Sequence, residues 1–321
     1  MALTAVKFTG QHDEKMSALR RYSKLGMGTL LGGLILGTSG CGPDRLAVLR
    51  SRLEARVEAS GADVVGIYFR DPSSGDSILL DADSRVHAAS MMKVPVMIQL
   101  FRDAEAGKFA LDDSVIVTNR FTSIVDGSQY ELSVPDDSEG TLYARLGEKE
   151  SIRQLTELMI TVSSNLATNI LIELVDAKRV QATMRELGAD SIEVLRGVED
   201  IKAYDAGLSN TTTARDLGII FTAIYEQRAA SPESCREMIE ILSRQRFNEG
   251  IPAGLPEGTR VAHKTGSITE IRHDGGILFT PDGKAFVLVV LTKGIEDSSD
   301  ADVLIADIAR TVYDEVVSAK G

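Results

Sequence analysis

Apolar residues follow two different spacings along the chain, and the changes of spacing mark its predicted elements. Leucine and valine recur at helical intervals over residues 44–59, which predicts an amphipathic helix. Residues 64–69 and 78–80 have the character of strands, and a turn with proline and glycine at 71–75 separates them. The sequence therefore predicts one helix followed by a strand pair at this end.

In the middle of the chain, from about residue 88 to 250, apolar residues recur mostly at helical intervals. A buried helix is predicted to begin close to Ser90. Further helices are predicted at residues 152–162, 166–175, 213–228 and 233–247. A polar segment at 119–150 interrupts them, and it is longer than a compact domain usually leaves without regular structure.

Strand spacing returns near residue 260. Residues 260–265, 271–279 and 285–292 are predicted strands, and residues 300–317 form a closing amphipathic helix. Strands at both ends with helices between them predict an α+β fold.

One short stretch, Ser90-Met91-Met92-Lys93, carries candidate chemistry. Its serine and lysine are three residues apart, so they lie on one face of a helix, one turn apart. A serine hydroxyl needs a neighbouring base to act as a nucleophile. A lysine buried among apolar side chains has a lowered pKa and can accept that proton. The alternative is a helix N-cap serine followed by a surface lysine.

Two further stretches favour the chemical interpretation. A Ser-Ser-Asn sequence at 163–165 separates two predicted apolar helices, and a Lys-Thr-Gly-Ser sequence at 264–267 ends a predicted strand. Ser-x-x-Lys, Ser-Asp-Asn and Lys-Thr-Gly together are the signature of class A β-lactamases and penicillin-binding proteins. All three occur here in the family's order, with Ser164 in place of the aspartate. The chain therefore resembles the class A β-lactamase-like, penicillin-recognising serine hydrolases.

The resemblance implies an antiparallel five-stranded sheet flanked by the terminal helices, with an inserted all-helical lobe. Residues 44–321 would then form a single serine hydrolase domain. Its helical lobe would span about 88–250, and its sheet lobe would combine 44–87 with 251–321. The resemblance also implies that 121–143 is a loop beside the substrate; the alternative is a disordered surface insertion.

The same resemblance implies roles for individual residues. Ser90 would attack an amide or lactam carbonyl, Lys93 would take its proton, and Ser163 would relay a proton to the leaving nitrogen. The N–H groups of Ser90 and Ser267 would form the oxyanion hole, and Lys264 would place positive charge near the substrate carboxylate. The substrate-binding residues would be Asn165, Thr265, Gly266, Ser267 and Arg272. A surface arginine is the alternative for Arg272, and Ser164 puts the rigidity of its turn in question.

The stretch from Arg196 to Asn210 departs from the family. Class A β-lactamases carry a loop whose glutamate, in a Glu-x-x-Leu-Asn pattern, activates the water that frees the acyl-enzyme. That pattern is absent here. Glu199 follows shortly after an arginine, as at the start of the family's loop, whereas Asp205 begins a similar pattern with aspartate and serine as replacements. We take Glu199 as the candidate base, and Asp205 or neither carboxylate as the alternatives.

This departure separates three hypotheses of function. With a working base the protein is a β-lactamase that acts through an acyl-enzyme, which is the favoured prediction. Without one it is a peptidoglycan D,D-carboxypeptidase or an esterase of the same fold. The third is a β-lactam or cell-wall binding protein that does not turn over.

Residues 1–40 read as a leader. A basic region precedes an apolar run at 25–36, which is too short to span a bilayer comfortably but suits a signal peptide. Small residues before Cys41 resemble a bacterial lipoprotein cleavage site. We therefore expect export to the periplasm or outer cell surface with a lipid anchor on Cys41. A plain signal peptide is the alternative, and translation could begin at Met1 or Met16.

The net charge and the cysteine content limit the kinds of partner and cofactor that we expect. The net charge is −12, and loss of the five basic and two acidic residues of 1–40 would make it −15. An acidic surface disfavours nucleic acid. Cys235 is the only cysteine besides Cys41, so no structural disulfide is expected. The cysteines and histidines do not have the spacing of a metal site, so neither a metal nor a cofactor is expected. The expected ligand is a small β-lactam or a peptidoglycan peptide, bound by a monomer.

Overall fold

A five-stranded antiparallel sheet is the centre of the structure, a computed structural model that describes residues 44–318. Its strands are β1 (Val64–Arg70), β2 (Ser77–Leu80), β9 (Val261–Ile268), β10 (Ile271–Phe279) and β11 (Ala285–Lys293), in the order β2-β1-β11-β10-β9. β1 pairs with β11 so that Val64 lies opposite Lys293. Strands from both ends of the described chain thus form one sheet with β9 at its edge, which confirms the predicted α+β fold.

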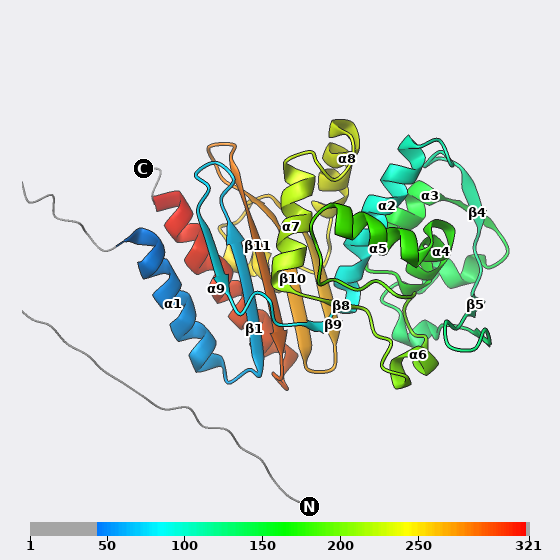
Figure 1. Cartoon of the computed structure of the whole chain (residues 1–321), viewed down its shortest axis with the longest axis horizontal. Helices are drawn as coiled ribbons and strands as arrows, with labels where there is room; N and C mark the ends of the chain where they lie inside the picture. The colour runs from blue at the N-terminus through cyan, green and yellow to red at the C-terminus, as the bar shows by residue number, and fades with distance from the viewer. Residues whose placement is uncertain (1–43, 319–321) are drawn as a thin grey trace, which may run out of the picture. The chain divides into compact units, whose positions relative to one another are not determined.

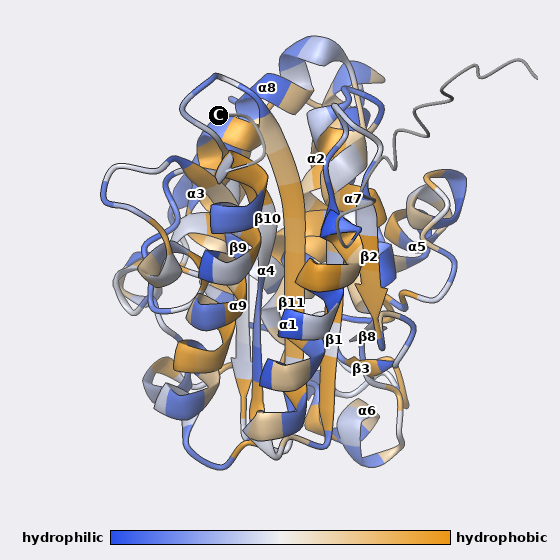
Figure 2. Cartoon of the chain, turned by 90° about the vertical axis from the view of Figure 1, so that its left-hand side faces the viewer, coloured by the Kyte–Doolittle hydropathy of each residue, from blue (hydrophilic) through white to orange (hydrophobic). Residues whose placement is uncertain are grey.

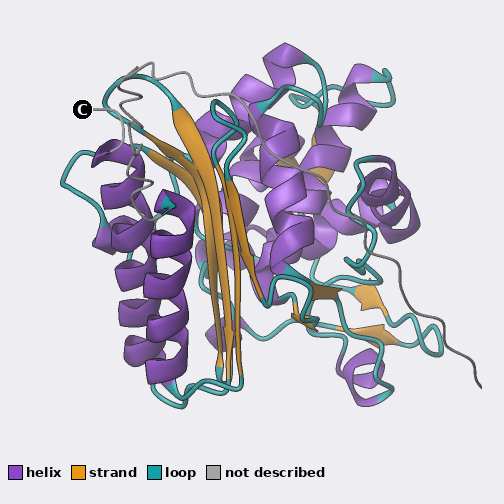
Figure 3. Cartoon of the chain, turned by 60° about the vertical axis from the view of Figure 1, so that its left-hand side comes forward, coloured by secondary structure: helices purple, strands orange, loops and turns teal. Residues whose placement is uncertain are grey.

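Helices cover both faces of this sheet. α1 (Arg45–Ser60) and α9 (Ser298–Ser318) cover one face, as Figure 3 shows. In β11, alternate residues point into two different cores, with Phe286, Leu288 and Val290 toward α9 and Val287, Val289 and Leu291 toward the opposite side. Figure 2 shows β11 as a largely hydrophobic strand behind the more polar surfaces of α1 and α9. Burial on both faces explains the uninterrupted apolar run of β11.

The opposite face is covered by α7 (Ala214–Tyr225), which packs on β1, β10 and β11. The remaining helices lie beyond it (Figure 1). They are α2 (Lys93–Glu105), α3 (Ile152–Thr161), α4 (Asn165–Val175), α5 (Ala177–Glu186), α6 (Ile201–Asp205) and α8 (Pro232–Leu242). Ten of the thirteen residues of α2 are buried. The helix that follows Ser90 is therefore held by neighbours on most of its surface. α8 buries Cys235.

The polar segment at 119–150 has regular structure, so the alternative of a disordered insertion is wrong. Within it β5 (Phe121–Thr122) pairs with β6 (Gln129–Tyr130), and at its end β7 (Lys149–Ser151) pairs with β4 (Ser114–Ile116), which lies just before the segment; both pairs are antiparallel. Two 3₁₀ turns follow β6, η2 (Val134–Asp136) and η3 (Thr141–Arg145). Phe121, Leu132 and Leu142 are buried in the helical core and anchor the segment there.

Three elements differ from the sequence expectation. α5 is not predicted by apolar spacing, because only Val180, Thr183 and Met184 of this polar helix are buried. α8 ends at Leu242, since the Gln245 side chain then accepts the backbone N–H groups that follow it and closes a turn. β9 continues to Ile268 through the Lys-Thr-Gly motif and does not end at it.

The predicted leader and Cys41 fall in residues 1–43, outside the described part of the chain. Within residues 44–318, no helix is both long and apolar enough to cross a bilayer.

Candidate active site

Ser90 lies on a 3₁₀ turn, η1 (Ala89–Met92), directly before α2. The two methionines of the turn are fully buried, and the Ala88 N–H just before it donates to the Asn210 carbonyl at 2.9 Å. Ala89 has a φ of 45°, a left-handed conformation that costs a non-glycine residue about 1–3 kcal/mol. Packing on both sides therefore holds a strained backbone next to the candidate nucleophile.

Lys93 is fully buried at the start of α2, so the alternative of a surface lysine is wrong. Its Nζ donates to the Ser163 carbonyl at 2.6 Å, the Ser163 hydroxyl at 3.1 Å and Asn165 Oδ1 at 2.9 Å. Burial lowers the pKa of Lys93 to about 7, although the carboxylates of Asp137 and Glu199 act in the opposite direction. A lysine with this pKa can accept a proton near neutral pH.

Lys264 on β9 is a second buried lysine beside the first. Its Nζ donates to the Ser163 hydroxyl at 3.0 Å and to the Thr265 carbonyl at 2.8 Å. Burial, and then the charge of Lys93, hold the pKa of Lys264 well below the ordinary lysine value. Both lysines donate to one hydroxyl, whose two lone pairs are then occupied. The Ser163 proton therefore stays available for a group in the adjoining cavity.

The three residues before and at the start of α4 have different tasks. Ser164 is the N-cap, and its hydroxyl accepts the Ala167 N–H at 3.2 Å. Ser163 has a φ of 58° and faces the two lysines. Asn165 bridges two sides of the site, because its Oδ1 accepts from Lys93 while its Nδ2 donates to Glu199 Oε1 at 2.7 Å. Of these three residues, only Ser164 caps the helix.

Gly266 allows the edge strand β9 to approach η1 closely. A Cβ on Gly266 would lie 3.1 Å from Met91 Cγ and 3.3 Å from Ala89 Cβ, which is tighter than ordinary contact. Ser267 follows at this closest point, and it lines the same cavity as Ser90. The arrangement fits an oxyanion hole made by the backbone N–H groups of Ser90 and Ser267.

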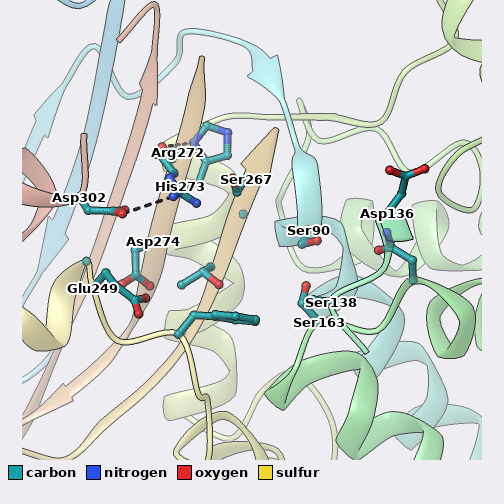
Figure 4. A pocket seen from close by; sticks show the side chains of 15 residues that line it. Ser90, Asp136, Ser138, Ser163, Glu249, Ser267, Arg272, His273, Asp274 and Asp302 are labelled. Carbon is teal, nitrogen blue, oxygen red and sulfur yellow. Dashed lines mark hydrogen bonds and ion pairs between the residues drawn. The ribbon is translucent and has the colours of Figure 1, made fainter. Parts of the chain in front are cut away.

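A cavity of about 520 Å³ separates Ser90 from the sheet. In Figure 4, Ser90 and Ser163 lie on one side of it, and Arg272 and Asp274 lie on the other. Thr265 also lines the cavity. Arg272 lines the cavity and is partly exposed, and it forms an ion pair with Asp302 of α9 at 3.4 Å that partly compensates its charge. Its role in binding the substrate carboxylate stays a prediction.

A second cavity, of about 780 Å³, opens on the other side of Ser90, and Glu199 lines it. Burial is the main cause that raises the pKa of the Glu199 carboxyl above its ordinary value. The next residue, Asp200, caps α6 and accepts the Ser123 hydroxyl at 2.9 Å and the Ile124 N–H at 3.0 Å. Glu199 is therefore the carboxylate of this loop that reaches Asn165.

Asp205 is exposed at the last position of α6 and lines neither cavity. The loop is closed at its two ends instead. Asn210 Oδ1 accepts the N–H groups of Leu195 at 2.8 Å and Arg196 at 3.3 Å, and Asn210 Nδ2 donates to the Arg196 carbonyl at 2.9 Å. The buried Arg196 guanidinium donates to the Leu208 carbonyl at 2.9 Å. Glu199 follows Arg196 of this closure by three residues, whereas Asp205 is exposed at the end of α6.

Several residues that hold the site give no signal in the sequence. The Asp137 carboxylate accepts the backbone N–H groups of Asn165 and Leu166. His273 Nε2 donates to the His87 carbonyl at 2.9 Å, three residues before Ser90. These partners lie far apart in the chain, so no local pattern could have identified them. No group of side chains suited to a metal ion occurs among the described residues.

Comparison with known proteins establishes the family. The family model described as the beta-lactamase enzyme family matches residues 48–316, most of the chain and all of the site. The chain belongs to this β-lactamase family. Its members' Ser-x-x-Lys and Lys-Thr-Gly motifs correspond to the two segments that place buried lysines beside Ser163.

Individual relatives are distant but cover nearly the whole fold. A β-lactamase of Streptomyces albus G is 26% identical over 281 residues, which are 86% of this chain and 87% of the relative. A solved β-lactamase from Sphaerobacter thermophilus is 29% identical, with a TM-score of 0.70 over 85% of this chain and 98% of that one. PBP-A is 28% identical, with a TM-score of 0.73 over 85% and 97%. A mutant of PBP-A was solved as an acyl-enzyme complex with penicillin G.

Proposed function

We propose that this member of the β-lactamase family hydrolyses β-lactams through an acyl-enzyme on Ser90, with Lys93 and Glu199 as the two proton acceptors. The observation that carries the proposal is the bridge made by Asn165, which binds Lys93 with one amide atom and Glu199 with the other. Ser90 lines both of the cavities that meet here. One face of the site therefore serves formation of the ester, and the other serves its hydrolysis.

Acylation begins when neutral Lys93 accepts the proton of the Ser90 hydroxyl. The Ser90 oxygen attacks the lactam carbonyl, and the backbone N–H groups of Ser90 and Ser267 stabilise the negative oxygen that forms. The C–N bond then breaks, and the nitrogen takes the proton of the Ser163 hydroxyl. Protonated Lys93 returns a proton to Ser163, with which it shares a hydrogen bond. Lys93 thus connects the proton removed from Ser90 to the proton delivered to the nitrogen.

Substrate binding uses the cavity on the sheet side. Thr265 and Arg272, which line this cavity, would bind the carboxylate that β-lactams carry, and the Asn165 amide would bind the acyl-side amide. Asp302 partly compensates the charge of Arg272. Lys264 is fully buried and lines neither cavity at Ser90, so its contact with the carboxylate stays a prediction.

Deacylation needs a water molecule activated on the other face. Glu199 accepts a proton from this water, and the resulting hydroxide attacks the ester carbonyl. The C–O bond to Ser90 then breaks, and the Ser90 oxygen takes up the proton that Glu199 had accepted, which restores the Glu199 carboxylate and the free hydroxyl. A carboxylate with a raised pKa is a better proton acceptor near neutral pH than an ordinary one. The exposed position of Asp205 argues against its taking this role.

A second candidate function follows from the similarity to PBP-A. If Glu199 fails to activate water, the acyl-enzyme would persist, and the protein would act as a slow D,D-carboxypeptidase or esterase, or as a β-lactam-binding protein. The absence of the family's glutamate pattern favours keeping this candidate.

Mass spectrometry of the intact protein tests the acylated residue. After incubation with a penicillin, the protein should gain the mass of one acyl group, and Ser90→Ala protein should gain none. Ser84→Ala, a change at a serine on the surface away from the site, should be labelled like the wild type. Labelling of Ser90→Ala would exclude Ser90 as the nucleophile.

The location of the protein is a separate proposal. Export through residues 1–40, with lipid on Cys41, would place a monomeric enzyme at the cell envelope, where its substrates are found. The support is the basic and apolar pattern before a cysteine that small residues precede. Cys41→Ala should move the protein from the membrane fraction to the soluble fraction, where size-exclusion chromatography should give a monomer mass. Unchanged membrane association would exclude the lipid anchor.

A further inference from the structure

The turn before α4 lacks a charge that the family's motif normally supplies. Ser164 stands where the motif has aspartate. Its fully buried hydroxyl accepts one backbone N–H of α4, that of Ala167. The first N–H groups of a helix have no partner within the helix, so those of Asn165 and Leu166 need an acceptor from elsewhere.

That acceptor is Asp137, which comes from the 119–150 segment. The Asn165 N–H donates to both carboxylate oxygens, at 2.9 and 3.0 Å, and the Leu166 N–H donates to Oδ2 at 2.9 Å. The Tyr143 hydroxyl at 3.0 Å and the Glu139 N–H at 3.1 Å hold the carboxylate in turn. Asp137 therefore fixes the start of the helix that carries Asn165.

We propose that Asp137 is a positioning residue that replaces the missing motif aspartate from a different segment of the chain. It orients Asn165 between Lys93 and Glu199, and it places a fixed negative charge beside both proton acceptors. The inference rests on the proposed function, since it concerns how the two acceptors are held and tuned. It also gives the 119–150 segment a task in catalysis beyond forming the edge of the cavity.

The charge of Asp137 acts on both acceptors in the same direction. It raises the pKa of Lys93 against the larger effect of burial, and it adds to the burial that raises the pKa of Glu199. The other charged groups that act on Lys93 are Glu199 and Lys264. The nearby charges of the helical lobe are paired: Arg179 of α5 with Asp103 of α2 itself, Arg153 of α3 with Glu237 of α8, and Arg244, just after α8, with Glu157 of α3. Loss of the Asp137 charge should therefore lower the pKa of Lys93 and that of Glu199 together.

Asp137→Asn tests this directly, because it keeps the shape of the side chain and removes its charge. The acid limb of the pH profile of acylation should move to lower pH, since Lys93 then loses its proton more readily. The rate at neutral pH should fall by up to about 10²-fold, the scale expected when a reacting group is misplaced by about 1 Å. Tyr143→Phe removes one anchor and keeps the charge, so it should slow acylation without moving the acid limb.

Asp176→Asn is the matched control. Asp176 caps α5 by accepting the Lys178 N–H at 2.9 Å, and it lines neither cavity at Ser90. This variant should lose thermal stability to a similar degree but keep the wild-type rate and pH profile. An equal shift of the acid limb in Asp176→Asn would overturn the specific role of Asp137.

A rescue experiment separates positioning from stability. Ser164→Asp in the Asp137→Asn background restores a carboxylate at the motif position and should recover most of the rate and the wild-type acid limb. Ser164→Asp alone places two carboxylates at one helix start and should lower the rate, so the effects of the two changes should be strongly non-additive. Additive effects, or Asp137→Asn with the wild-type rate and pH profile, would overturn the inference. If the wild type forms no acyl-enzyme at Ser90, the proposed function itself is wrong. If the wild type forms it and the Asp137 variants behave otherwise than predicted, only this inference is wrong.

Discussion

The two sides of Ser90 are built in different ways. On one side, Lys93 and Lys264 are fully buried on α2 and β9, and each belongs to an element packed in the core. On the other side, Glu199 is half-buried in the 196–210 loop, where Ile201 and Tyr204 expose 63% and 56% of their surface. The groups proposed for acylation are therefore part of the rigid core, whereas the proposed deacylating base depends on a surface loop. Loops with few buried apolar contacts open more easily than core elements.

Because of this difference, we expect changes in the loop and changes in the core to affect different steps of the reaction. A change in the loop should impair release of the acyl group and leave its formation intact. A change in the buried lysines should impair formation of the acyl-enzyme and everything that follows. A β-lactamase and an acylated binding protein then differ by the geometry of one loop on a shared acylating core.

The largest effect is expected for Lys93→Met. The change removes the proton acceptor of acylation while filling the buried space with an apolar chain, so the acylation rate should fall by about 10⁴-fold. The rate of the acylation burst with a chromogenic cephalosporin measures it. Lys284→Met, at an exposed turn, is the control and should behave as the wild type. An acylation burst of normal rate in Lys93→Met would show that this buried lysine is not the proton acceptor of acylation.

The pH dependence of acylation should follow Lys93. Its pKa of about 7 means that the neutral form, which accepts the proton, predominates above pH 7 and is depleted below it. The burst rate should therefore drop about tenfold per pH unit below this value, because each unit of pH changes the neutral fraction tenfold. A burst rate that is constant from pH 5 to 8 would show that another group accepts the proton.

A smaller and more selective effect is expected for Asn210→Ala. The side chain closes the loop with three hydrogen bonds, and losing them leaves buried backbone groups of Leu195 and Arg196 unpaired, at a cost of about 1–3 kcal/mol. Steady-state turnover should fall about tenfold, with the burst preserved, because such a loss in a loop shifts the population that holds Glu199 in place by this factor. Equal loss of burst and turnover would mean that the loop also supports acylation.

The smallest effect is expected for Asp205→Asn. This side chain is exposed and lines neither cavity, so turnover and burst should both stay within about twofold of the wild type, as surface changes usually do. Steady-state kinetics measures it. A large loss of turnover would transfer the role of base from Glu199 to Asp205.

The sequence predicts the core side of this contrast well, because its signals are local. The helical spacing after Ser90, the apolar strands and the two lysine motifs all depend on residues close together in the chain. The apolar run of β11 is visible for the same reason. These features predict the α+β fold class and favour a buried Lys93, whereas the burial of Lys264 is not predicted.

The loop side depends on contacts that local patterns do not record. Glu199 reaches Asn165 because its φ is 61°, which few non-glycine residues adopt, and because Asn210 closes the loop eleven residues later. Asp137 reaches the start of α4 across 28 residues of chain. Both depend on tertiary packing, which is why the sequence left Glu199 and Asp205 as alternatives and gave no role to Asp137.

The most direct test compares the burst and the steady state of Glu199→Gln with a chromogenic cephalosporin. Glutamine keeps the shape of the side chain but cannot accept a proton from water. We predict an unchanged acylation burst, steady-state turnover slower by about 10²–10⁴-fold, and acyl-enzyme that accumulates in the mass spectrum. Turnover equal to that of the wild type would contradict the assignment of Glu199 as the deacylating base.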